Sequence, residues 1–303
     1  VGDIQTNANV HIGTGGRIVA AADADAEVTA YGLSLSAGTG IGLLSGNSLG
    51  AAVSPIETQV TVLSATSGSG DGIHIVENGS LELGTVVSAV DASKSVVVSR
   101  VHIDGTTYAS SVSSQSDVWT SAGNGPIVVR AVGGDLVLKA GSGVVDGAGA
   151  VRASGSGNIL LAAEGSGRDV TVEDGADVVS VTGHVTVRAA DALSMGSAVS
   201  VSTGGSGTLE VLAGTGSLLM SPTASLNTVS GDIRVVVGDD GADVVRLGAI
   251  TASAANVSIA ASGAVYDVDA AVDIVANALQ VSAKSFGLLS GNSLGAAVNP
   301  VPP

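Results

Sequence analysis

The chain has 303 residues, of which 45% are apolar but only 2% aromatic, so Val, Ala, Leu and Ile supply most of its apolar content. Its 27 acidic and 11 basic residues give a net charge of −16, which argues against nucleic acid or anionic membranes as partners, because both need clustered Lys and Arg. The absence of Cys excludes disulfides and thiolate metal sites, and no apolar run of about 18 residues predicts insertion into a membrane.

The first segment of the chain contains short stretches in which apolar and other residues alternate, "ANVHI" at 8–12 and "LSLSA" at 33–37. Such alternation predicts strands with one buried face. The octapeptide "GLLSGNSL" follows at 42–49, and we expect its Leu-Leu pair in a short strand and "SGNS" in the turn after it. Because the chain starts at Val1 in the middle of this pattern, we also expect it to be part of a larger protein.

The next stretch, residues 60–134, keeps the spacing of the other segments poorly. It contains the polar interruption "SSVSSQSDVWTSAGNG", and insertions in repeat proteins map to turns on one side, so we expect loops that leave the body of the protein here. Tyr108 and Trp119 flank the Ser-rich part. Since Tyr and Trp dominate recognition hot spots, these two residues are candidate ligand contacts. The alternative is that Trp119 packs the loop against the body of the protein.

A signature of apolar, any, apolar, any and small residues recurs through the rest of the chain. Its first apolar positions are Leu136, Ile159, Val185, Leu209, Ile233, Val257 and Leu279. The spacing is about 24 residues, with roughly three short strands in each interval. An antiparallel sandwich or barrel also has short strands at regular intervals, but only a solenoid places the same positions of every coil in the same environment.

We therefore predict an all-β fold in which residues 1–303 form one continuous parallel β-solenoid. The chirality rule for parallel crossovers favours a right-handed coil. Alanines of the signature, such as Ala140, Ala163, Ala189, Ala213 and Ala261, are expected to stack in a file along one edge.

The end of the chain repeats its beginning. "ANVSI" at 255–259, "LQVSA" at 279–283 and "GLLSGNSL" at 287–294 match the three stretches of the first segment. Residues 255–300 are thus a second copy of residues 8–55, at a distance of about 245 residues. We expect one long repeat and the beginning of the next.

One stretch carries a resemblance to a known family. "GNILLAAEGSGRDVTVEDGADVVSVTGHVTVRAADA" at 157–192 resembles the repeats of giant bacterial surface and secreted proteins with filamentous-haemagglutinin-type β-helical stalks. The resemblance implies an extracellular, rod-like protein at the cell surface that serves in adhesion, biofilm matrix or filament formation. The N-terminal module that directs secretion in that family is not in this sequence.

Acidic turns are the candidate metal sites. "GDDGAD" offers Asp239, Asp240 and Asp243, and hard oxygen ligands suit Ca²⁺. "VEDGAD" offers further carboxylates at Glu173, Asp174 and Asp177. Neither matches a known calcium repeat, and the alternative for both is an Asp-Gly turn between strands. The four histidines His11, His74, His102 and His184 lie far apart in sequence and predict no metal site.

Three functions fit these features. The first is a stalk or fibre segment whose partners are neighbouring repeats or copies of itself, stacked end to end. The second is an adhesin module that recognises a glycan or cell surface through loops at 104–125. The third is a polysaccharide-degrading enzyme, which would use Asp239, Asp240 and Asp243, but the chain has few aromatic residues to bind sugars. We predict the first, without enzymatic activity and without a cofactor.

Overall fold

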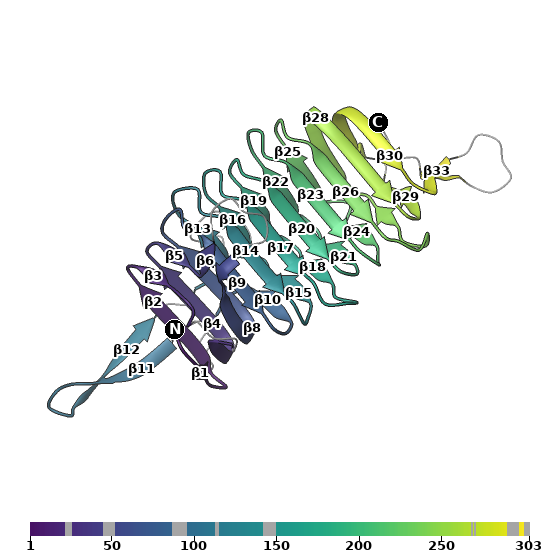
Figure 1. The fold of residues 1–303 in the computed structure, drawn as a ribbon. Helices are drawn as coiled ribbons and strands as arrows, with labels where there is room; N and C mark the ends of the chain where they lie inside the picture. The colour runs from purple at the N-terminus through teal and green to yellow at the C-terminus, as the bar shows by residue number, and fades with distance from the viewer. Residues whose placement is uncertain are drawn as a thin grey trace.

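The computed structural model describes residues 1–21, 26–44, 52–86, 96–112, 115–141, 150–267, 269, 271–289 and 297–299. Every regular element in these ranges is a β-strand. One sheet contains 27 strands, all paired in parallel, and winds into a rod with the termini at opposite ends (Figure 1). The fold is a parallel β-solenoid, as the sequence predicts.

Three walls enclose the interior of the rod, and each is a stack of parallel strands from successive coils. Wall A contains β9 (Ile73–Glu77), β14 (Ile127–Ala131), β17 (Ile159–Ala163), β20 (Val185–Ala189), β23 (Leu209–Ala213), β26 (Ile233–Val237) and the second halves of β28 (Ala249–Ala261) and β30 (Ile274–Ser282). Wall B contains β10 (Leu81–Leu83), β15 (Leu136–Leu138), β18 (Val170–Val172), β21 (Leu193–Met195), β24 (Leu218–Met220), β27 (Val245–Arg246), β29 (Ala264–Tyr266) and β31 (Ser285–Phe286). Wall C contains β13 (Val118–Thr120), β16 (Val151–Ala153), β19 (Val178–Ser180), β22 (Ser200–Thr203), β25 (Ser225–Thr228) and the first halves of β28 and β30.

The N-terminal coils use longer strands that run along more than one wall. They are formed by β1 (Ile4–Gln5), β2 (Asn9–Thr14), β3 (Arg17–Ile18), β4 (Val28–Ala37), β5 (Gly40–Ile41) and β8 (Ile56–Ser67). β8 pairs with β10 through Leu63 and with β13 through Ala65, so one strand of this coil lies beneath two strands of the next.

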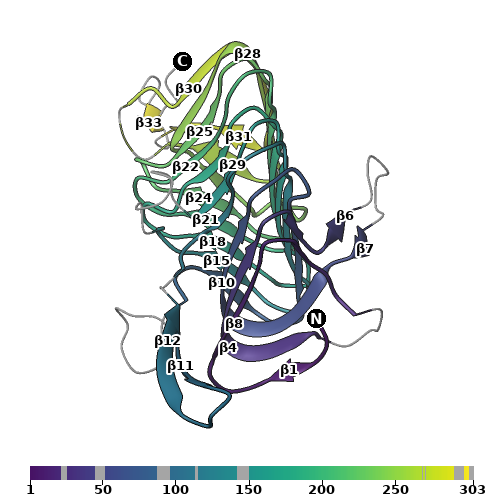
Figure 2. The same cartoon turned by 90° about the vertical axis from the view of Figure 1, so that its left-hand side faces the viewer.

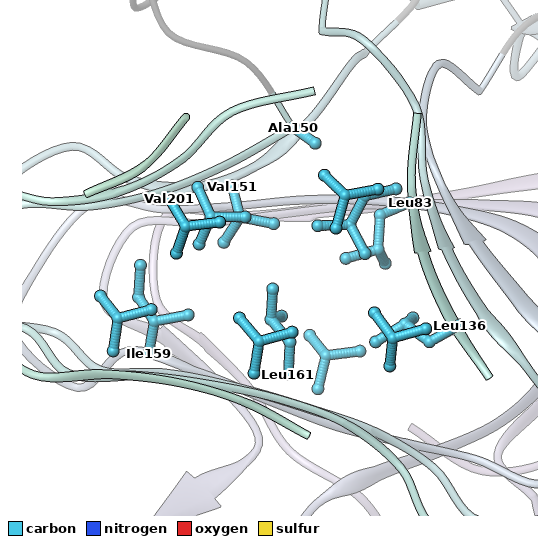
Figure 3. Packing of buried hydrophobic residues seen from close by; sticks show 14 of the residues in the cluster. Leu83, Leu136, Ala150, Val151, Ile159, Leu161 and Val201 are labelled. Carbon is cyan, nitrogen blue, oxygen red and sulfur yellow. The ribbon is translucent and has the colours of Figure 1, made fainter. Parts of the chain in front are cut away.

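The period-two alternation of side chains along each strand explains which residues fill the interior of the rod. Most three-residue wall strands bury their first and third side chains and leave the middle one half-exposed. Figure 3 shows Val151 and Val201 on one wall facing Ile159 and Leu161 on another, with Leu136 at the remaining side. The interior is narrow, and aliphatic side chains without aromatic bulk fill it, which accounts for the composition of the chain.

The pairing of the strands shows that one member of the predicted 24-residue series was assigned wrongly. Leu136 pairs with Val170 on wall B, whereas the partner of Ile159 on wall A is Ile127. The signature that begins at Leu136 therefore belongs to a different wall from the others. Strands of walls A and B share the same apolar alternation, and the distance from Leu136 to Ile159 matches one coil by coincidence. From Val185 onward the predicted register of wall A is confirmed.

The predicted file of stacked alanines has one wrong member. Ala131, Ala163, Ala189 and Ala213 pair in succession at the end of the wall A strands and are buried. Ala140, which the sequence places in this file, is exposed beyond the end of β15 on wall B. The error has the same cause as the misassigned strand.

A file of glycines follows the corner between walls C and A. Gly157, Gly183, Gly207 and Gly231 lie one above the other, and a Cβ atom on any of them would come within 3.0 Å of the carbonyl oxygen of the glycine below, the lowest of which is Gly125. Buried hydroxyls line the same corner. Thr203 donates to the oxygen of Gly183 at 2.5 Å, and Ser180 donates to that of Gly157 at 2.7 Å. Close backbone approach, and not a left-handed φ, requires these glycines.

Asp and Asn side chains at this corner and at the corner between walls A and B link successive coils. In each case a side-chain oxygen accepts a hydrogen bond from a main-chain N–H of the coil above. The pairs are Asn124 with Ser156 (3.0 Å), Asp135 with Asp169 (3.1 Å), Asn158 with His184 (2.9 Å), Asp169 with Ala192 (3.0 Å) and Asp232 with Asn256 (2.9 Å). These contacts satisfy main-chain donors where the strands are interrupted, so the acidic turns are part of the fold.

In the part of the chain that the structure describes, three hairpins leave the coil. β6 (Leu43–Leu44) pairs antiparallel with β7 (Ala52–Ser54), and β32 (Leu288–Leu289) pairs antiparallel with β33 (Ala297–Asn299). The largest consists of β11 (Val96–Val101) and β12 (Thr107–Val112), within the chain segment that connects β10 to β13. It extends past the N-terminal coils, on a different side of the rod from β6 and β7 (Figure 2). Within residues 60–134 the other described strands follow the coil.

The two copies of the repeated segment have the same pairings. Val10 pairs with Leu33 in the first copy, and Val257 pairs with Leu279 in the second. Ile18 with Ile41 corresponds in the same way to Val265 with Phe286. The duplicated Leu-Leu pair forms a short strand in both copies, as expected. The "SGNS" turns lie outside the described residues.

Candidate functional site

The hairpin of β11 and β12 carries one of the two candidate aromatic residues. Tyr108 pairs with Arg100 across the hairpin, and the Arg100 Nη1 donates to the Tyr108 hydroxyl at 3.0 Å. The ring of His102 lies 4.5 Å from that of Tyr108, centroid to centroid. At the tip, Asp104 Oδ1 accepts hydrogen bonds from the N–H and the hydroxyl of Thr106 and closes a tight turn.

This hairpin is exposed and carries both apolar and polar side chains. Val101 is 70% exposed, Ile103 is fully exposed, and Tyr108 is exposed as well. The cation of Arg100 lies 5.9 Å from the centre of the Tyr108 ring. Tyr108, Arg100 and His102 therefore form one polar and aromatic face beside exposed aliphatic side chains, a composition typical of protein recognition surfaces.

Trp119 lies elsewhere. It belongs to β13 in wall C, where it is half-buried and pairs with Thr66 below and Arg152 above. The range 104–125 thus divides between the hairpin and the wall, and the structure places Tyr108 and Trp119 on different elements.

The base of the hairpin segment is fastened to the second coil. Gln115 donates from Nε2 to the carbonyl oxygen of Leu35 at 2.8 Å and accepts from the hydroxyl of Ser34 at 3.0 Å. Val86 N–H donates to the oxygen of Gln115, so the outgoing and returning chain meet at this point. These contacts anchor the segment against the side of the rod.

Asp239, Asp240 and Asp243 lie together in the turn between β26 and β27. Their carboxylate oxygens are within 4.8 Å of one another, but Asp239 and Asp240 are exposed and Asp243 is half-buried. Asp240 Oδ1 accepts from the N–H of Ala242 at 2.8 Å, as in an Asx turn. Burial, together with the negative charge of Asp240, raises the pKa of Asp243.

The carboxylates of "VEDGAD" bind neighbouring coils. Glu173 forms an ion pair with Lys139 of the coil below. Asp174 accepts from the N–H of Ser197 at 2.6 Å, and Asp177 accepts from the N–H of Ser200 at 2.7 Å. Each acidic side chain of this turn therefore has a partner in the adjacent coil.

Sequence reasoning missed a second group of carboxylates, at the corner between β29 and β30. Oxygens of Asp267, Asp269 and Asp273 lie within 4.8 Å of one another. Asp267 is 0% and Asp273 is 3% exposed, whereas Asp269 is more accessible than either. Burial raises the pKa of Asp273 to about 7, and the charges of Asp267 and Asp269 contribute. The spacing "DVDAAVD" was the available signal, but nothing in it indicates burial.

The histidines occupy separate elements in the described part of the chain. The His11 Nδ1 lies 3.1 Å from the Ser34 hydroxyl, and the His184 Nδ1 lies 2.8 Å from that of Thr208. His74 is buried in wall A, and His102 is on the hairpin. None of them belongs to a group of metal-ligating side chains among the described residues.

An open groove of about 470 Å³ lies on the outer side of wall B. Glu173, Ser194, Leu219 and Arg246 line it, and the Arg246 Nε donates to the carbonyl oxygen of Met220 at 3.0 Å. Asp239, Asp240 and Asp243 do not line this groove. The carboxylates named for sugar hydrolysis are therefore on a separate turn.

Comparisons with family models, curated proteins and solved structures find no match for this chain. Among the described residues, no helix has the length and hydropathy to cross a membrane.

Proposed function

We propose that this chain is a structural rod, a segment of a longer repetitive stalk or fibre in which further coils of the same kind continue the stack. The observation that supports it is the contrast between the two copies of the repeated segment. In the first copy, strand β8 of the next coil covers Leu33, which is 0% exposed. The equivalent Leu279 in the second copy is 44% exposed. Ile41 and the equivalent Phe286 are 0% and 46% exposed.

The last coil is therefore a sheet edge with uncovered apolar side chains. Strand edges expose unpaired main-chain N–H and C=O groups and template pairing with another strand. In the first copy, this position is covered by residues 56–73, which directly follow the first small hairpin. A coil of that type after the second small hairpin would bury Leu279 and Phe286 and pair the exposed edge of β30.

The mechanical role follows from the ladder of parallel strands. Main-chain hydrogen bonds run along the rod from coil to coil, and the aliphatic interior is continuous between them. In such a one-dimensional stack, stability is approximately the sum of the coil terms and the nearest-neighbour interfaces. A rod of this kind can be lengthened by repetition without a new fold. The resemblance to bacterial surface repeats makes the cell surface or extracellular matrix the proposed location.

A tandem fusion tests this proposal. Residues 56–303 are appended after Pro300, which corresponds to Pro55 in the repeat. We expect one straight rod of nearly twice the length in electron micrographs, because the appended coil continues the stack. The main-chain amides of 278–286 should become as protected from hydrogen exchange as those of 32–41.

The control joins two complete chains through a flexible Gly-Ser linker, which holds the same mass without continuing the repeat. Two rods at variable angles, and unchanged exchange at 278–286, are expected for the control. The same result for the in-phase fusion would contradict the proposal.

A second candidate, an adhesin module, is favoured by the exposed face of the β11 and β12 hairpin. Replacement of residues 96–112 by a short Gly-Ser turn should abolish binding to a glycan or host surface while the circular dichroism of the rod is unchanged. The replacement of Trp119 by Phe is the matched control, since Trp119 lies in wall C. Binding that survives removal of the hairpin would exclude this candidate.

A further inference from the structure

The corner between β29 and β30 holds the three carboxylates of Asp267, Asp269 and Asp273 in a turn fastened at both ends. The N–H of Leu247 donates to the carbonyl oxygen of Tyr266 at 2.9 Å, and the N–H of Ile250 donates to that of Asp273 at 2.6 Å. Both donors belong to the coil below, so the ends of the turn have fixed positions in the stack.

Two of these carboxylates are buried with an oxygen that has no partner. The Asp267 Oδ1 accepts from the N–H of Asp269 at 2.7 Å, but the Asp267 Oδ2 accepts no hydrogen bond. The Asp273 Oδ2 also has none. Both residues are more than nine-tenths buried. The Asp243 Oδ2 also has no partner, but Asp243 is only half-buried. Asp177, by contrast, accepts a main-chain N–H group from the coil above.

Burying unpaired carboxylates is costly, and placing them together adds mutual repulsion. No ion pair with Lys, Arg or His is formed by these three residues among the described contacts. The raised pKa of Asp273 has the same origin. A bound cation would remove both the unmet hydrogen-bonding capacity and the repulsion.

The separation of the oxygens suits one ion. Calcium binds oxygen ligands at about 2.3–2.6 Å, so two ligands of the same ion lie at most about 5 Å apart. The three carboxylates offer oxygens within 4.8 Å of one another. We propose that Asp267, Asp269 and Asp273 bind a calcium ion, which fastens the corner between walls B and C near the end of the rod.

The first copy of the repeat indicates the competing explanation. Glu27 corresponds to Asp273, and its Oε2 accepts from the N–H of Glu57 in the next coil at 2.6 Å. If a further coil were stacked on β30, one of its main-chain N–H groups would donate to the Asp273 Oδ2 in the same way. A single amide, however, gives the Asp267 Oδ2 no hydrogen-bond partner and neutralises no charge. A divalent cation would bind both oxygens and neutralise the carboxylates.

Calorimetric titration of the whole, chelator-treated chain with CaCl2 tests the site. We expect one Ca²⁺ per chain, with a dissociation constant at or below about 1 mM, the range of weak extracellular calcium modules. We also expect a calcium-dependent rise of the thermal midpoint. Mg²⁺ should bind more weakly, because it dehydrates reluctantly.

The Asp267→Asn and Asp273→Asn variants should each lose at least tenfold in calcium affinity. Without calcium their thermal midpoints should rise, because each removes a buried unpaired charge. Asp240→Asn, in the exposed acidic turn, is the matched control and should bind calcium as the wild type does. If a buried variant fails to fold by circular dichroism, Asp269→Asn, at the most accessible of the three positions, must still show the tenfold loss.

Absence of calcium binding at millimolar CaCl2 would overturn the site. So would equal affinity in the wild type and the Asp267→Asn and Asp273→Asn variants, or loss of binding in Asp240→Asn alone. The test does not depend on the tandem fusion, so the cation site and the proposed structural role can fail separately.

Discussion

Replacing Gly207 by alanine should destabilise the rod by about 3 kcal/mol or more, at the upper end of what overpacking costs. A Cβ atom at this position would come within 3.0 Å of the carbonyl oxygen of Gly183 and of the Thr203 hydroxyl. The carbonyl belongs to the main chain of the coil below, and the hydroxyl donates to that same oxygen. This carbonyl oxygen cannot move away without separating two coils. Chemical denaturation followed by circular dichroism measures the effect.

Gly15→Ala is the matched control for this prediction. Gly15 lies between β2 and β3, and no atom is within 4 Å of the place where its Cβ would stand. We expect a change of about 0.5 kcal/mol or less, as for most surface substitutions. Equal denaturation midpoints for the two variants would show that the glycine file is not required for coil stacking.

Replacing Leu161 by alanine should cost about 2–5 kcal/mol, because the deleted side chain leaves a cavity in a close-packed interior. Leu161 is 0% exposed and lies between the walls (Figure 3). In a stack of coils the loss falls on the coil of β17 and its neighbours β14 and β20, with which β17 pairs. Hydrogen exchange should therefore increase first in these strands.

Leu160→Ala provides the comparison at the adjacent position of the same strand. Leu160 is half-buried on the outer side of wall A, so the same deletion should cost less than about 1 kcal/mol. A similar cost for both substitutions, measured by the same denaturation experiment, would contradict the assignment of the inward face of β17.

The period of the coil is visible in sequence because every coil repeats the same environment. The alternation at Val185–Ala189 and Leu209–Ala213 identifies strands, their buried faces and their partners. The same reasoning was wrong at Leu136, because a triplet on wall B has the same apolar pattern as one on wall A. The long connection after β15 obscured the true partner of Ile159, which is Ile127.

The candidate sites were less predictable than the fold. Asp240 and Asp273 are the same residue type in similar acidic stretches, yet one is exposed and the other is 3% exposed. The sequence identifies the acidic turns, but it does not show in which of them the carboxylates become buried. In the same way, Tyr108 and Trp119 flank one polar stretch, but only Tyr108 is on the projecting hairpin.

The amino-acid sequence by itself determined the class of fold, the strand-forming triplets and the duplication of the end segment, because these depend on local alternation and on identity between copies. The tertiary structure decided the rest: which wall each triplet joins, which glycines meet a carbonyl of the coil below, and which carboxylates remain buried without a partner. Those properties arise only when one coil is stacked on another, since the contacts that define them join residues of different coils.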